Sequence, residues 1–187
     1  MSQRQVFVSI GLGVLRLVFS LLGAAVPGLL GIPGSSGVIN ILWAGGFLAL
    51  PPLITRALGS ATVAAVIYSL LALPLPLSGP PGFLPKVLIG ILSGLTADLV
   101  MMLVRIAPNF ERSLSTLAGA ASQTVLGISL VLLGIAFQVP GIDQAAKLQF
   151  SLPGMAATIL GGAFSGFLGW LVYHALKESD LVARSRL

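Results

Sequence analysis

The chain has 187 residues, of which 56% are hydrophobic and 8% are charged, whereas a soluble domain carries roughly 25% charged residues. This composition predicts an integral membrane protein in a single domain, 1–187, since too little polar sequence remains for a separate soluble module. The formal net charge is +5, but the basic residues are scattered singly, which argues against nucleic acid as a partner. The absence of cysteine excludes disulfides and thiolate metal sites.

Long apolar stretches, separated by Gly/Pro-rich loops or short charged turns, predict an all-α fold of six transmembrane helices. The approximate spans are 6–26, 38–55, 57–75, 83–104, 114–137 and 152–176. Pro51 and Pro52 are expected to break the second span. The alternative to a full crossing there is a re-entrant or strongly tilted segment. A short amphipathic turn is expected within 138–151.

The basic residues are distributed unevenly between the two ends of the predicted helices. With six spans both termini lie on one side, and most of the basic residues lie there too, namely Arg4, Arg56, Arg105, Arg112, Lys177, Arg184 and Arg186. Only Lys86 and Lys147 fall on the other side. The positive-inside rule therefore predicts cytoplasmic N and C termini. The outer loops, 27–37, 76–82 and 138–151, either cover a pocket that opens outward or serve only as connectors.

Two charged residues lie inside predicted spans and away from their ends, Arg16 in the first and Asp98 in the fourth. A charge at membrane depth is costly unless it faces protein or water. A snorkelling arginine can bridge the difference in depth between the two positions. We therefore predict that Arg16 and Asp98 pair and hold the first helix against the fourth, the alternative being a proton relay.

Small residues spaced three or four apart mark faces where helices approach closely. Ser9 and Gly13 form such a row in the first span, and Gly162 and Gly166 form one in the sixth. Packing within the bundle is the simpler interpretation of any one row. The alternative is that these four residues dock a partner subunit.

Polar and aromatic residues near the outer ends of the spans are candidates for binding a small planar ligand. Aromatic stacking supplies contact area, and amides fix orientation. The alternative is that the aromatics belong to the interfacial belt and that the lysine is a snorkelling anchor. The candidates are Asn40, Trp43, Phe83, Lys86, Gln138, Asp143, Gln149 and Phe150.

The fourth span carries a resemblance to a known family. Residues 79–100 read GPPGFLPKVLIGILSGLTADLV, and an arginine and then residues 113–122, SLSTLAGAAS, follow. This pattern resembles the substrate-binding S components of energy-coupling factor (ECF) transporters, nearest to the hydroxymethylpyrimidine/thiamine permease type. There too, a glycine-rich outer loop leads into a helix of pattern IGIxxGLxA followed by an acid. A weaker similarity runs from Ile41–Trp43 to Arg56 and Gly59.

The resemblance implies a protein of the prokaryotic plasma membrane that captures a vitamin or vitamin precursor from outside, a thiamine-like heterocycle among them. It implies a transmembrane T component and two cytoplasmic ATPases as partners, no cofactor, and a docking face of small residues on the first helix. The sequence has no P-loop or other catalytic motif, so we do not expect an enzyme. Two other functions remain open: a small secondary carrier or channel that uses Asp98 and Arg16, and a structural subunit of a larger membrane complex.

Overall fold

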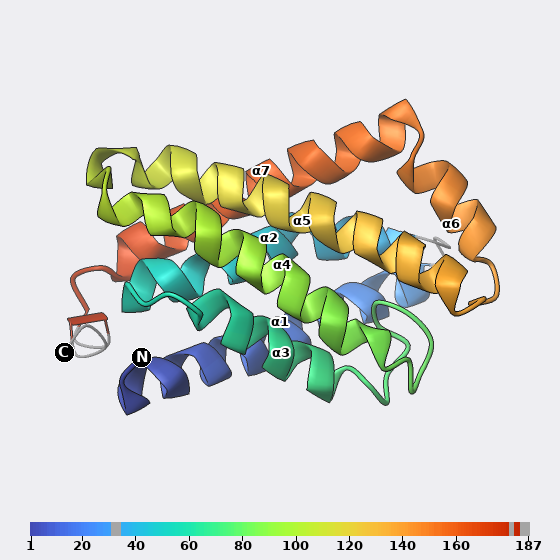
Figure 1. Ribbon diagram of the computed structural model, residues 1–187, viewed down its shortest axis with the longest axis horizontal. Helices are drawn as coiled ribbons and strands as arrows, with labels where there is room; N and C mark the ends of the chain where they lie inside the picture. The colour runs from blue at the N-terminus through green and yellow to red at the C-terminus, as the bar shows by residue number, and fades with distance from the viewer. Residues whose placement is uncertain (31–34, 180–181, 184–187) are drawn as a thin grey trace.

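The computed structural model describes residues 1–30, 35–179 and 182–183. Over these residues the chain is helical and forms no strand. The long helices lie side by side and run in alternating directions along the longest axis of the molecule (Figure 1). We call the end at which α1 begins and α7 finishes the terminal end, and the opposite end, which holds the short helix α6, the α6 end (Figure 1).

Each predicted span corresponds to one helix, and α6 lies within 138–151, where a short amphipathic turn was expected. The elements are α1 (Gln3–Leu30), α2 (Ser35–Thr55), α3 (Ser60–Leu71), α4 (Pro85–Met102), η1 (Leu103–Arg105), η2 (Pro108–Phe110), α5 (Glu111–Ala136), α6 (Ile142–Gln149) and α7 (Leu152–Leu176). By length and hydropathy four segments can cross a membrane: 3–25, 85–102, 108–136 and 152–176. The apolar parts of α2 and α3, 40–55 and 60–71, are shorter. The predicted loop 27–37 is shorter than expected, since α1 extends to Leu30, and its centre lies outside the described residues.

The prediction that Pro51 and Pro52 break the second span is wrong, because α2 continues through both of them to Thr55. Each proline removes one backbone donor from the helix. Packing offsets this loss: residues 44–55 are all buried, and α2 contacts α1, α5 and α7. The Thr55 hydroxyl also donates to the Pro51 carbonyl at 2.8 Å.

The third helix is shorter than the predicted span 57–75. It begins after Gly59, whose φ of 88° is left-handed, and it has 12 residues. At about 1.5 Å per residue this gives roughly 18 Å, less than the ~30 Å thickness of a hydrocarbon core. Pro74 and Pro76 follow its end and cannot continue it. The chain then reaches α4 through a loop at the α6 end (Figure 1).

Small residues let neighbouring helices touch. A Cβ added at Gly13 would lie 2.5 Å from the Ala64 carbonyl oxygen of α3. One added at Gly162 would lie 2.7 Å from the Gly119 carbonyl oxygen of α5, and Gly166 meets the Ser115 backbone of the same helix. The four candidates for docking a partner, Ser9, Gly13, Gly162 and Gly166, are all buried within the chain. They therefore serve internal packing and are not exposed to a partner.

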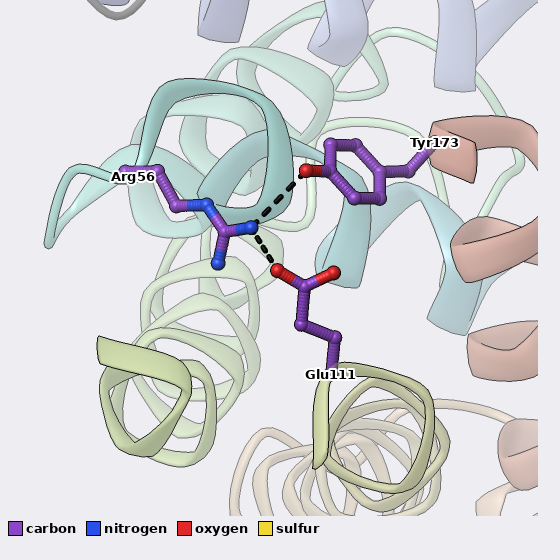
Figure 2. Close-up of polar contacts among 3 residues, drawn as sticks. All are labelled: Arg56, Glu111 and Tyr173. Carbon is purple, nitrogen blue, oxygen red and sulfur yellow. Dashed lines mark hydrogen bonds and ion pairs between the residues drawn. The ribbon is translucent and has the colours of Figure 1, made fainter. Parts of the chain in front are cut away.

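Three elements are tied together at the terminal end (Figure 2). Arg56, between α2 and α3, donates from Nη2 to Glu111 at the start of α5 and to the Tyr173 hydroxyl of α7, the latter at 3.1 Å. The Arg56–Glu111 contact is the only ion pair between two described residues. Burial lowers the pKa of Arg56, but the hydrogen bond and charge of Glu111 outweigh this and raise it overall, so the guanidinium stays charged.

Candidate ligand-binding site

A cavity of about 260 Å³ lies among the helices toward the α6 end. Its walls come from α1, α2, α3, α5, α6 and α7 and from the loop before α4. Its apolar walls include Ile41, Leu126 and Leu130. Its side chains with polar groups are Arg16, Ser20, Asn40, Tyr68, Ser78, Gln123, Gln149 and Thr158. A mostly apolar cavity with a few convergent polar groups is typical of a small-molecule site.

Arg16 is the charged residue of this cavity. Its side chain on α1 is 3% exposed, and its guanidinium carbon lies 4.2 Å from the centre of the Tyr68 ring on α3. Nε and Nη1 are buried and donate no hydrogen bond within the described part of the chain. No carboxylate of that part lies within 4.0 Å of it. The stacking on Tyr68 fixes the guanidinium, but it does not satisfy the donors.

Gln123 on α5 brings a second unsatisfied donor to the same cavity. The residue is 2% exposed, and its Nε2 has no hydrogen-bond partner among the described residues. A buried polar group without a partner costs about 1–3 kcal/mol. Two such groups around one cavity are suited to donate hydrogen bonds to a polar group of solvent or of a ligand.

Asn40 and Gln149 are the sequence-predicted candidates that line the cavity. The Asn40 Oδ1 accepts a hydrogen bond from Trp43 Nε1 at 3.2 Å, which orients the amide. Trp43 itself does not line the cavity, and packs edge-on against Phe19 with ring centres 5.9 Å apart. Gln149 Nε2 donates to the Thr158 hydroxyl at 3.3 Å where α6 meets α7.

The other predicted candidates lie elsewhere. Phe83 is buried edge-on against Phe137, with ring centres 6.0 Å apart, and lines a separate hollow of about 460 Å³ beside α6. Lys86 is buried rather than snorkelling, and its Nζ donates to the carbonyls of Ala72 at 3.1 Å and Leu75 at 2.6 Å. The remaining three are exposed at the α6 end: Gln138, Asp143 and Phe150.

The predicted pair of Arg16 and Asp98 is not formed. Asp98 accepts hydrogen bonds from the backbone N–H groups of Ala61 at 3.0 Å and Thr62 at 2.9 Å, and from the Thr62 hydroxyl at 2.7 Å. It therefore caps the first turn of α3, while Arg16 stacks on Tyr68 in the second half of the same helix. About six residues of α3, roughly 9 Å of rise, separate the two contacts.

Sequence reasoning missed the cavity residues Ser20, Tyr68, Ser78, Gln123 and Thr158. Gln123 carried a usable signal, because an amide in the middle of the apolar span 114–137 must find a partner or accept a desolvation cost. The other four are too common in membrane helices and loops to be singled out by type alone.

No protein-family model matches the chain, and no curated protein matches it in sequence. A solved structure does match the fold, and is described as the crystal structure of an S-component of an ECF transporter. It aligns at a TM-score of 0.61 with 24% sequence identity, over 96% of this chain and 85% of that one. The chain has the fold of an ECF-transporter S component. This fold agrees with the four helices that are long and apolar enough to cross a membrane.

Proposed function

We propose that this chain is the substrate-binding subunit of an ECF-type transporter and captures a small water-soluble nutrient from outside the cell. The observation that carries the proposal is the partly open cavity with unsatisfied Arg16 and Gln123 donors, set in an S-component fold. Buried donors without partners are costly in a protein that has no use for them. A bound ligand gives them a use.

The proposed orientation has six crossings, with both termini in the cytoplasm of a prokaryotic cell. It is supported by the basic residues Arg56, Arg112 and Lys177 at the terminal end, since cytoplasmic loops are enriched in Lys and Arg. The cavity, toward the α6 end, then lies in the outer half of the membrane and receives ligand from outside.

In this proposal the chain binds the nutrient, and it does not hydrolyse ATP. A transmembrane T component and two cytoplasmic ATPases supply the energy, as the S-component fold and the lack of a nucleotide-binding motif support. A vitamin or vitamin precursor is the proposed class of nutrient. The similarity of residues 79–100 to the hydroxymethylpyrimidine/thiamine type makes a thiamine-like heterocycle one candidate of that class, and its retention would contradict the carboxylate ligand inferred below.

The two other functions have less support. A proton-driven carrier needs a carboxylate that can exchange protons along the transport path, but Asp98 does not line the cavity and already accepts three hydrogen bonds. Nothing in the described residues favours a purely structural subunit, which has no need for a polar cavity.

The proposal is tested by purifying the full chain in detergent and identifying by mass spectrometry the small molecules that it retains. We expect one compound that is retained by the wild type and by the exposed control Asp143→Asn, and is lost from Asn40→Ala and Gln123→Leu. The same compound, added back, should raise the melting temperature with its occupancy. If all four proteins retain the same compounds, the cavity is not the binding site.

A further inference from the structure

The cavity has a positive charge without a matching negative one. Arg16 is the one charged side chain among its described lining residues, and the others are neutral. Lys86 approaches from a small adjoining void, but its ammonium group donates to the Ala72 and Leu75 carbonyls. Arg16 is thus buried, and no carboxylate of the described residues compensates its charge.

Cation–π stacking on Tyr68 lowers the cost of burying Arg16 but replaces neither the lost hydration nor the missing hydrogen bonds. The Tyr68 ring covers one face of the planar guanidinium. The edges of the guanidinium, which carry the N–H donors, stay available. An arginine held in this way is suited to a planar, negatively charged acceptor.

We propose, on the basis of the proposed function, that the ligand is a small monocarboxylate, whose carboxylate pairs with Arg16 while Gln123 donates to a further acceptor. A single negative charge matches the single cation. A phosphate monoester carries close to two negative charges at neutral pH, and one arginine would leave the excess charge buried. A cationic ligand such as thiamine would meet Arg16 with no carboxylate to oppose it.

The other residues that line the cavity indicate the character of the rest of the ligand. Ile41, Leu126 and Leu130 provide apolar contact, and Asn40 and Gln149 provide amides on the side of the α6 end. The cavity volume of about 260 Å³ lies near the lower end of the range for small-molecule sites, which favours a small ligand.

The charge of the ligand is tested with probes that share one shape. The melting temperature of the ligand-free full chain in detergent is measured with nicotinate and benzoate, each beside its carboxamide, at matched ionic strength. We expect both carboxylates to raise the melting temperature in a concentration-dependent way, and the carboxamides to raise it less. Arg16→Gln should remove this difference, whereas the exposed control Lys147→Gln should keep it. Equal shifts for carboxylate and carboxamide, or no shift from either carboxylate, would overturn the assignment.

A second measurement needs no ligand. Arg16→Met replaces the charge by an apolar side chain that can still pack on Tyr68, so the ligand-free variant should melt at a higher temperature than the wild type. A lower melting temperature would show that Arg16 is structural.

The two proposals fail separately: if the compound retained on purification is neutral or cationic but is lost from Asn40→Ala, the transport function stands and the monocarboxylate is wrong.

Discussion

Asp98 stabilises the start of α3 and does not pair with the buried charge of Arg16. Its carboxylate accepts three hydrogen bonds from Ala61 and Thr62, at the positive end of the α3 dipole. The sequence places Asp98 at a depth along α4, but it does not give the direction in which the side chain points around the helix. The prediction of a pair with Arg16 used depth alone, and for this reason it failed.

Asp98→Asn should lower stability by about 1–3 kcal/mol, because the amide can accept fewer of the three hydrogen bonds and places a donor against N–H groups. Its effect should add to that of Arg16→Gln within about 0.5 kcal/mol, as expected for residues that do not touch. Thermal or chemical unfolding of the single and double variants in detergent measures both. A coupling energy between the two substitutions of several times that size would show that Arg16 and Asp98 do interact.

The lining of the cavity was predictable only in part. Asn40 and Gln149 were among the predicted candidates and do line the cavity, because polar residues at the ends of apolar spans are few. Trp43 was also predicted, but it does not line the cavity and instead orients Asn40 by a hydrogen bond. Phe83 packs against Phe137, and Lys86 donates a hydrogen bond to the carbonyl of Ala72 at the end of α3. Both roles depend on the path of the chain after Leu71, which the sequence does not specify.

At the scale of elements, α1 offers a matched pair of glycines. Gly13 contacts the α3 backbone, whereas a Cβ at Gly11 would meet nothing within 4 Å. Gly13→Ala should destabilise the protein by about 1–3 kcal/mol through overpacking. Gly11→Ala should be neutral, or stabilising by up to about 1 kcal/mol through helix propensity. Melting temperatures in detergent test this, and equal effects of the two substitutions would contradict the close contact between α1 and α3.

The contacts of Arg56 with Glu111 and Tyr173 should contribute modestly to the free energy of unfolding, since the side chains of Arg56 and Glu111 are 28% and 23% exposed. Glu111→Gln should cost about 1 kcal/mol or less, and the loss should shrink in high salt. Unfolding of the variant at low and high salt measures this, with the exposed Glu178→Gln as control. A large loss that is independent of salt would mean that Glu111 acts through packing rather than charge.

The helices show which features follow from local sequence. The bounds of α7 were predicted from its long apolar run, and α6 from its amphipathic pattern. The continuity of α2 through two prolines was not predictable, because burial against the surrounding helices decides it. The rows of small residues were predictable as contact faces, but whether the contact was internal could not be read from the chain.

At the scale of the whole molecule, composition was sufficient to predict an all-helical membrane protein, and the cavity was not predictable. The cavity exists because residues distant in sequence, from Arg16 to Thr158, converge at one end of the bundle. Its charge follows from the absence of an acidic side chain around Arg16 among the described residues, which only a three-dimensional arrangement can establish.

The orientation in the membrane can be measured directly, since the native chain has no cysteine. Gln144 on α6 and Ser113 at the start of α5 are both exposed and lie at opposite ends. A cysteine at Gln144 should react with an impermeant thiol reagent added to intact cells, and one at Ser113 should react only after permeabilisation. The reverse pattern would place the cavity on the cytoplasmic side.

The central claim is that the chain captures a nutrient but cannot pump it. Proteoliposomes that hold only the purified chain should bind the compound identified by mass spectrometry without concentrating it, even under a proton or sodium gradient. Addition of a T component and its two ATPases should give concentrative uptake that requires ATP, and Asn40→Ala should abolish that uptake. Robust gradient-driven uptake by the chain alone would contradict the account and would make the protein a secondary carrier.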